Sequence, residues 1–201
     1  RPVGVQTRTR APEVNITLGE AIRGRSFWLL TAFSVVLSFP MSGVFIILTS
    51  YYSDIGFSAA LAAAATGAFA VAAAAARLFW GFMSEKFPIR YLFTVQMLLS
   101  GVCLGLILAM SFFHFMLRVW ILLPLAASMG FVAGGSVLLR GIVWPEYFGR
   151  LHIGAIRGVA QPFEAVSSAV GPVFAAFVFD STGSYGFSFG AFIAMYIAAA
   201  F

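Results

Sequence analysis

Two ionisable side chains lie within long apolar segments, where a charge is costly unless it has a partner or a function. Arg77 lies about four residues inside the end of one such segment, and Glu164 about nine residues into another. A guanidinium group can bind a carboxylate through two parallel hydrogen bonds. A carboxyl group beside a hydrated cavity can carry a proton or contact a substrate. The two residues therefore predict a site that binds an anion and exchanges protons.

Arg77 shares its helical face with small side chains, as a projection at about 100° per residue shows. These are Ala63, Thr66, Ala70, Ala73, Ala74 and Gly81. The bulky residues Leu61, Val71, Leu78, Phe79 and Phe82 lie on the other side. Bulky faces usually contact lipid, whereas small faces pack on protein or line a cavity. The pattern favours a cavity-facing Arg77; the alternative is an arginine whose side chain extends to the membrane–water interface.

Glu164 lies on a polar helical face within an otherwise apolar segment. That face carries Arg157, Ala160, Gln161, Ser167, Ser168 and Gly171, and the opposite face carries Val159, Val166, Val173 and Phe177. Such a face inside a membrane indicates a polar, hydrated cavity. We expect Glu164 to couple proton movement and Gln161 to contact the substrate. A protonated Glu164 that makes an interior hydrogen bond is the alternative.

Arg140 follows Gly134-Gly-Ser136 near the end of a third segment. It is predicted either to anchor that segment at the interface or to contact the substrate. Pro40, Pro124 and Pro162 interrupt backbone hydrogen bonding within segments, which is typical of bending or gating helices and equally of static kinks. The side chains of Trp28, Trp120 and Trp144 fall at segment ends, where interfacial anchors are expected.

The composition defines the surroundings of these residues. Of the 201 residues, 61% are hydrophobic and only 9% are charged, against about 25% charged in soluble domains. Six apolar segments are predicted, at about 28–51, 58–82, 91–112, 119–142, 155–179 and 187–201. The last is short for a span, and the chain opens on Arg1, so we expect a longer protein. Cys103 alone predicts no disulfide and no cysteine-based metal site, and no metal or cofactor is expected.

Basic residues are concentrated in alternate loops. Nine occur in the opening segment and in two loops, namely Arg1, Arg8, Arg10, Arg23, Arg25, Lys86, Arg90, Arg150 and Arg157, and only Arg118 in the others. This asymmetry predicts that residues 1–26 and the loops at 84–90 and 144–154 are cytoplasmic. The loops at 52–57, 113–117 and 180–186 should be external. The net charge of +5 therefore reflects topology rather than nucleic-acid binding.

Residues 1–26 divide into two parts. Thr17 to Arg25 are predicted to form a short interfacial helix. Asn15 or Thr17, together with Glu20, supplies the expected signal for the start of this helix. Residues 1–14 are either part of the same ordered segment or a solvated linker.

The ten residues Gly81-Phe-Met-Ser-Glu-Lys-Phe-Pro-Ile-Arg90 form a charged loop between two apolar segments. They resemble the loop signature Gly-x-x-x-Asp-Arg/Lys-x-Gly-Arg/Lys of the major facilitator superfamily of transporters, with Glu85 for Asp, Lys86 as the base and Pro88 for the second Gly. Pro145-Glu-Tyr-Phe-Gly-Arg150, Gly154-Ala-Ile-Arg-Gly158 and Ala169-Val-Gly171-Pro172 resemble the carboxyl-terminal half of these proteins. Thr17-Leu-Gly-Glu-Ala-Ile-Arg with Phe27-Trp-Leu-Leu30 is most similar to the monocarboxylate and oxalate:formate antiporter branches.

The resemblance implies an all-α membrane bundle of six transmembrane helices, the last truncated, built as two inverted three-helix repeats. The spans at 27–201 would form half of a twelve-helix transporter and pair with an amino-terminal half in the plasma or inner membrane. The implied function is secondary transport of a small organic anion such as a monocarboxylate, with proton coupling or exchange, and an anion-binding arginine at Arg77. Transport of a non-anionic molecule, or a non-transporting binding or regulatory role, are the alternatives.

Two departures from these branches narrow the expected substrate. The monocarboxylate branch has an acid one turn before its arginine, where this chain has Ala73. The oxalate branch has a lysine in its eleventh helix, where the comparable depth here offers Glu164. A dianion such as oxalate is therefore not expected. No enzyme is expected either, because neither His114 nor His152 is paired with a nucleophile or a second ligand.

Overall fold

Seven α-helices account for nearly all of the residues that the computed structural model describes, which are 16–54, 56–110 and 115–200. Their bounds are α1 Leu18–Arg23, α2 Arg25–Asp54, α3 Ala59–Lys86, α4 Ile89–Ala109, α5 Phe115–Phe148, α6 Ile153–Thr182 and α7 Gly186–Ala200. These ranges contain no β-strand, so the all-α class is confirmed. The predicted linker at 1–14, His114 and the start of the loop at 113–117 lie outside them.

The five helices α2 to α6 are long and apolar enough to cross a membrane, and α7 is a shorter apolar helix. This matches the predicted five full segments and one short one. The helices extend beyond the apolar segments at several ends. In particular, α5 continues through Pro145 to Phe148, so the loop expected at 144–154 is reduced to residues 149–152. Gly149 ends α5 in the left-handed region, with φ 77°, and its N–H donates to the carbonyl of Pro145 at 3.0 Å.

Local sequence explains where the helices begin and end. The carboxylate of Glu20 accepts hydrogen bonds from the N–H and hydroxyl of Thr17, at 2.9 and 2.7 Å, which confirms the predicted start of α1. These hydrogen bonds hold the pKa of Glu20 below its ordinary value. The Ser58 hydroxyl accepts from the N–H of Leu61 and caps α3. Pro88 stands between α3 and α4 and prevents them from continuing as one helix.

Two helix pairs form the closest contacts of the fold, and glycine makes both possible. In α5, a Cβ atom on Gly130 or Gly134 would overlap the backbone of Phe69 or Ala73 of α3. In α6, a Cβ atom on Gly171 would overlap the backbone of Phe39 of α2. Small residues at such contacts let helix backbones approach closely in a membrane, where van der Waals packing is a main source of association energy.

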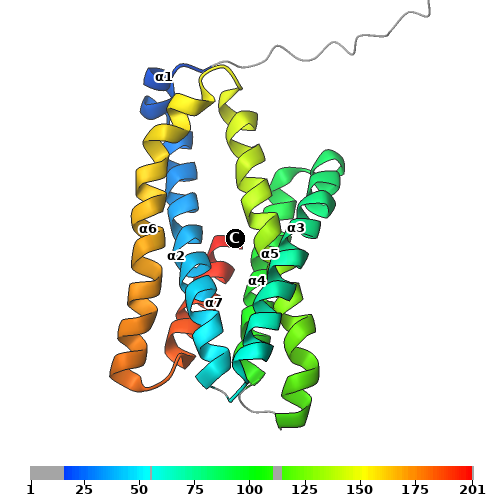
Figure 1. Ribbon diagram of the computed structural model, residues 1–201. Helices are drawn as coiled ribbons and strands as arrows, with labels where there is room; N and C mark the ends of the chain where they lie inside the picture. Colours follow the sequence, from blue (N-terminus) through cyan, green and yellow to red (C-terminus); the bar gives the residue numbers. More distant parts are fainter. Residues whose placement is uncertain (1–15, 55, 111–114, 201) are drawn as a thin grey trace, which may run out of the picture.

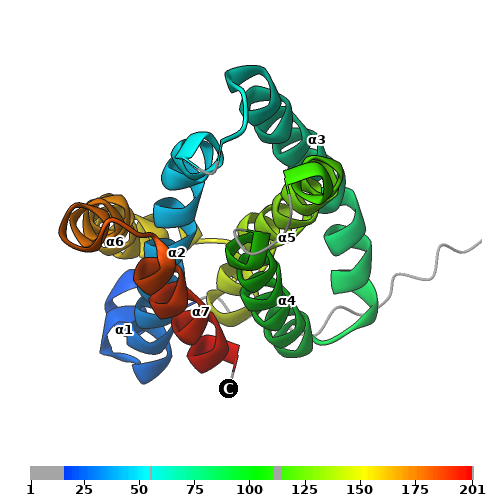
Figure 2. The same cartoon turned by 90° about the horizontal axis from the view of Figure 1, so that it is seen from below.

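The helices α2, α3 and α4 make the same pattern of contacts as α5, α6 and α7, respectively. The contact of α2 with α6 corresponds to that of α5 with α3, and the contact of α7 with α2 corresponds to that of α4 with α5. Equivalent helices run in opposite directions, as α2 and α5 do in Figure 1. An inverted repeat of three helices has this pattern. Viewed from below, the α2–α6 and α3–α5 pairs lie apart, and α4 and α7 join them along one side (Figure 2).

The exposed apolar side chains lie where the helical projections predict lipid. Leu78 and Val71 of α3 are 80% and 72% exposed, and Val173 and Phe177 of α6 are 67% and 69% exposed. The prediction for Trp144 is wrong. This residue is fully buried and stacks on Phe148, because α5 continues past the expected segment end and carries Trp144 into the contact with α2. Trp28 and Trp120 are exposed.

Candidate functional site

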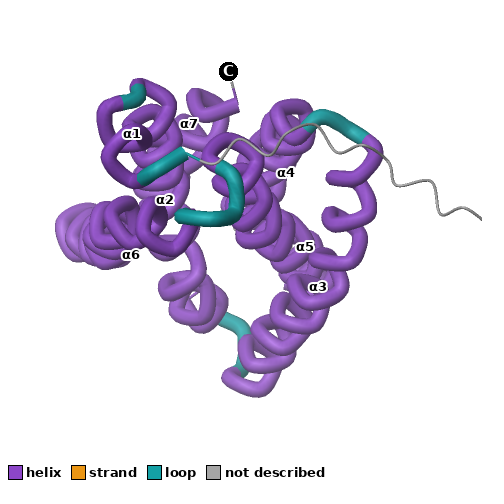
Figure 3. Tube along the Cα trace, turned by 90° about the horizontal axis from the view of Figure 1, so that it is seen from above, coloured by secondary structure: helices purple, strands orange, loops and turns teal. Residues whose placement is uncertain are grey.

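A cavity of about 490 Å³ lies between the two helix pairs. Residues of α2, α3, α5 and α6 form most of its lining, with Ser100 of α4 and Tyr196 of α7 where these helices join the pairs. Viewed from above, no described helix covers the opposite side, between α2 and α3 (Figure 3). All four of the residues predicted to bind substrate or carry protons, Arg77, Arg140, Gln161 and Glu164, line this cavity.

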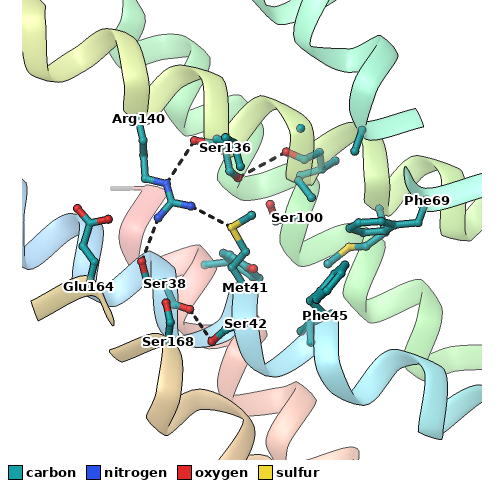
Figure 4. A pocket seen from close by; sticks show the side chains of 18 of the residues that line it. Ser38, Met41, Ser42, Phe45, Phe69, Ser100, Ser136, Arg140, Glu164 and Ser168 are labelled. Carbon is teal, nitrogen blue, oxygen red and sulfur yellow. Dashed lines mark hydrogen bonds between the residues drawn. The ribbon is translucent and has the colours of Figure 1, made fainter. Parts of the chain in front are cut away.

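Arg140 is held in the cavity wall by contacts that cross from α5 to α2 (Figure 4). Its Nη1 atom donates to the Ser38 hydroxyl at 3.0 Å, and its Nη2 atom lies 3.0 Å from the sulfur of Met41. Its Nε atom donates to the carbonyl of Ser136, 3.3 Å away and one turn earlier in α5. An interfacial anchor would extend outward, so this geometry places Arg140 in the cavity rather than in the anchoring position considered from the sequence.

Arg77 lines the same cavity from α3 but is exposed. Among the described residues it has no hydrogen bond or ion pair. Its neighbour one turn earlier, Ala73, packs against Gly134 of α5. The small face predicted around Arg77 is therefore divided, because Ala73 meets α5 while Thr66, Ala70 and Ala74 stay exposed. The guanidinium of Arg77 is free to contact a ligand.

The polar face of α6 is divided between packing on α2 and lining the cavity. Ser167 and Gly171 pack against α2, where the Ser167 hydroxyl donates to the carbonyl of Val35 at 2.6 Å. Gln161, Glu164 and Ser168 instead line the cavity. Within the described part of the chain, Glu164 has no hydrogen-bond partner, so the interior hydrogen bond considered as the alternative is not formed there. Glu164 interacts electrostatically with Arg140 across the cavity without a salt bridge.

A buried polar cluster behind the cavity was not predicted from the sequence. The amide nitrogen of the fully buried Gln96, on α4, donates to the hydroxyls of Ser136 and Ser100 and to the carbonyl of Val132. Ser136 also accepts from Arg140 through its carbonyl, so the cluster supports the arginine. A signal was present, since Gln96 is the one amide within an apolar segment of 21 residues. Ser38 and Ser42, which flank Pro40 one turn apart in α2, are a similar group of polar residues within an apolar segment.

The residues of the loop signature lie at the end of α3 and the start of α4. Glu85, Lys86 and Arg90 are exposed. Lys86 packs its ammonium group 4.2 Å from the ring centroid of Phe82, and Arg90 donates to the hydroxyl of Tyr91 at 3.2 Å. A Cβ atom on Gly81 would be 3.8 Å from Leu138, an ordinary contact. The closest approach between α3 and α5 is therefore at Gly130 and Gly134 of α5 and not at Gly81.

The second predicted motif, Gly171 with Pro172, lies in α6 at the contact with α2. Gly171 lies against the carbonyl of Phe39, which leaves no room for a Cβ atom. Within the described ranges, no three acidic, histidine or cysteine side chains are grouped closely enough to hold a metal ion.

Comparisons with known proteins give a distant likeness. No model of a known protein family matches the chain. The chain is 25% identical over 179 residues to monocarboxylate transporter 12 of Rattus norvegicus, a match that covers 83% of this chain and 35% of that protein. It is also 25% identical over 169 residues to monocarboxylate transporter 12 of Mus musculus, which covers 81% and 33%. The chain thus spans about a third of the length of these curated relatives.

The structure and these matches together define a helical membrane protein with distant similarity to a member of the major facilitator superfamily. The similarity agrees with the monocarboxylate branch named from the sequence. The assignment to a carboxyl-terminal half and the likeness to the oxalate:formate branch stay predictions.

Proposed function

We propose that the chain is the carboxyl-terminal half of a secondary transporter that moves a small organic anion, such as a monocarboxylate, by alternating access. The observation that carries the proposal is the cavity that Arg77 and Arg140 line from one helix pair and Glu164 lines from the other. Charged groups at this depth are costly in a membrane protein and mark substrate or proton pathways. The named function of the distant relatives supports the same reading.

Each charged residue has a defined role in this proposal. Arg140 is held by Ser38, Met41 and Ser136, so its guanidinium is already oriented before a substrate binds. A preorganised group loses little conformational entropy on binding, which favours affinity. Arg77 supplies a second guanidinium, which has no partner among the described residues. Gln161 offers a neutral donor and acceptor beside them.

Glu164 is the proposed proton carrier. When Glu164 is ionised, its negative charge is attracted to Arg140, as the carboxylate of an anionic substrate would be. The two carboxylates then compete for the same cation. When it is protonated, that competition disappears and the anion binds more favourably. Proton and anion would therefore bind together, which gives either proton symport or anion exchange. No enzymatic reaction and no cofactor is part of the proposal.

The fold supplies elements suited to alternating access. The two glycine-packed pairs make few contacts with each other apart from those through α4 and α7. The side of the cavity between α2 and α3 has no covering helix in the described chain (Figure 3). We propose that an amino-terminal six-helix half covers this side, and that residues 27–201 form the corresponding carboxyl-terminal half in a plasma or inner membrane, with residues 1–26 in the cytoplasm.

Uptake by proteoliposomes that contain the full-length protein tests the function. Radiolabelled lactate and pyruvate, the dianion oxalate and uncharged glucose would be compared, with protein-free liposomes subtracted. Saturable uptake of lactate or pyruvate, increased by an inward proton gradient or by internal unlabelled anion, is the expected result. Uptake of glucose alone would favour a non-anionic substrate, and no uptake of any solute would favour a binding or regulatory role.

A further inference from the structure

The cavity has a charged end and an apolar end. Arg140 and Glu164 lie at one side of the pocket, and Phe45 and Phe69 lie at the other (Figure 4). The distance between the charged end and the apolar end is similar along one helix of each pair. Along α2, Phe45 comes seven residues after Ser38, the partner of Arg140, which corresponds to about 10 Å. Along α3, Phe69 comes eight residues before Arg77, or about 12 Å.

The apolar end is an aromatic surface made by both helix pairs. The rings of Phe45 on α2 and Phe69 on α3 have centroids 5.6 Å apart and planes inclined by 51°. Met129 of α5 belongs to the same end, because the next residue, Gly130, packs on the backbone of Phe69. The Phe45 side chain is 57% exposed although it faces the cavity. Phe69 is partly buried. Aromatic side chains on a pocket wall, one of them exposed, suit contact with an apolar part of a ligand.

The placement of charge in the cavity favours a ligand with one carboxylate and an uncharged tail. The charged lining residues in the described chain are Arg77, Arg140 and Glu164. With Glu164 protonated, as in the proposed anion-bound state, the two guanidinium groups are the charges that a carboxylate meets. The apolar end offers no cation for a second carboxylate, so a long dianion would place a charge against Phe45 and Phe69. Burial of an unpaired charge there is unfavourable.

We propose that the substrate is a monocarboxylate with an aromatic or similarly flat apolar tail, bound with its carboxylate at the arginines and its tail against the aromatic surface that Phe45 and Phe69 form together. This inference rests on the proposed function and names its substrate class. Short carboxylates such as lactate would bind at the charged end only. Phe45 and Phe69 are then specificity-determining residues, since they act on the tail and not on the carboxylate.

Calorimetric binding to the purified full-length protein tests the proposal with three matched compounds. Lactate and 3-phenyllactate have the same carboxylate and hydroxyl and differ by a phenyl ring. The diol 3-phenylpropane-1,2-diol keeps the ring and lacks the charge. We expect 3-phenyllactate to bind at least about tenfold more tightly than lactate, because the ring buries apolar surface. The diol should bind more weakly than 3-phenyllactate by a similar or larger factor.

The double variant Phe45→Leu/Phe69→Leu assigns the effect to these rings. It should weaken binding of 3-phenyllactate much more than binding of lactate, so that the ratio of the two affinities falls toward one. Phe177→Leu is the matched control, because Phe177 is 69% exposed on α6 and does not line the cavity. Size-exclusion profiles and melting temperatures would show whether each variant is folded.

Several results would overturn the proposal. Equal affinity for lactate and 3-phenyllactate on the unmodified protein would do so without any variant. If the folded double variant still prefers 3-phenyllactate over lactate as strongly as the unmodified protein does, the two rings do not determine specificity. If lactate is transported but the ring gives no advantage, this inference fails and the proposed function stands. If neither carboxylate binds or is transported, both fail.

Discussion

The Nη1 atom of Arg140 on α5 donates a hydrogen bond to the Oγ atom of Ser38 on α2, at 3.0 Å. The two helices are equivalent members of the two repeats, and the bond joins one helix pair to the other at the wall of the cavity. It is formed by residues 102 positions apart in the chain. The orientation of the principal cation of the site thus depends on how the helix pairs are placed.

Ser38→Ala should raise the KM for anion uptake by about tenfold, because a hydrogen bond to a charged group is lost and the guanidinium becomes less ordered. The smaller side chain fits without strain, so the protein should insert normally. Ser42→Ala is the control. The Ser42 hydroxyl lies one turn away and donates only within α2, to the carbonyls of Ser38 and Phe39. A variant at Ser38 with the KM of the unmodified protein would show that the bond does not orient the site.

Arg77→Lys should weaken transport by about tenfold or more, because an ammonium group cannot replace the two parallel hydrogen bonds of a guanidinium. Expression and membrane insertion should stay near normal, since Arg77 is exposed and has no partner among the described residues. Arg150→Lys, in the loop between α5 and α6, provides the control. If Arg77→Ala retains near-normal affinity for the transported anion, Arg77 is not part of the binding site.

Glu164→Gln should abolish accumulation driven by a proton gradient and spare part of the exchange of internal for external anion. The amide keeps the size and polarity of the side chain and cannot carry a proton. Accumulation and exchange would be measured separately in the same proteoliposomes. Ser168→Ala, on the same cavity face of α6, should keep both activities. Proton-driven accumulation by the Gln variant would exclude Glu164 as the carrier.

Gly134→Ala should destabilise the protein by about 1–3 kcal/mol, because the added Cβ atom meets the backbone of Ala73 and not a movable side chain. The expected observation is a melting temperature several degrees lower in detergent. Gly141→Ala is a stringent control, since it lies on the same helix with nothing within 4 Å of an added Cβ atom. Equal melting temperatures for the two variants would mean that α3 and α5 are not packed as described.

Residue 86 should be accessible only from the cytoplasm, and residue 184 only from outside, because of the asymmetry of basic residues. Single cysteines at Lys86 and Ser184, both exposed, would be treated with an impermeant thiol reagent on intact cells. The buried Cys103 and all other cysteines would be replaced first. Labelling of position 86 from outside would reverse the orientation of the whole bundle.

The sequence predicted the helices and the charged part of the site for the same physical reason. Apolar segments of about 20 residues must be helical in a membrane, since every backbone polar group has to be satisfied internally. Within them, Arg77, Arg140, Gln161 and Glu164 are costly enough to stand out, and all four line the cavity. Their roles in binding and proton transfer stay predictions.

The rest of the site depends on tertiary packing that local patterns do not contain. The Ser38 partner of Arg140 looks like any serine in an apolar helix. Phe45 and Phe69 resemble lipid-facing residues in sequence, because a phenyl ring suits both lipid and an apolar pocket. Trp144 shows the reverse error: it has the type and position of an interfacial anchor, yet the continuation of α5 buries it.

The order of the helix pairs has a consequence for biosynthesis. The α3–α5 contact is nested within the α2–α6 contact along the chain, and α7 comes last. Because α5 leaves the ribosome before α6, the inner contact can close while α2 still lacks its partner. During that interval the carbonyl of Val35 in α2 lacks the hydroxyl of Ser167 in α6 that later donates to it. The glycines that close both contacts, Gly130, Gly134 and Gly171, all belong to the part of the chain made later, so the first three long helices wait for the second three to complete the bundle.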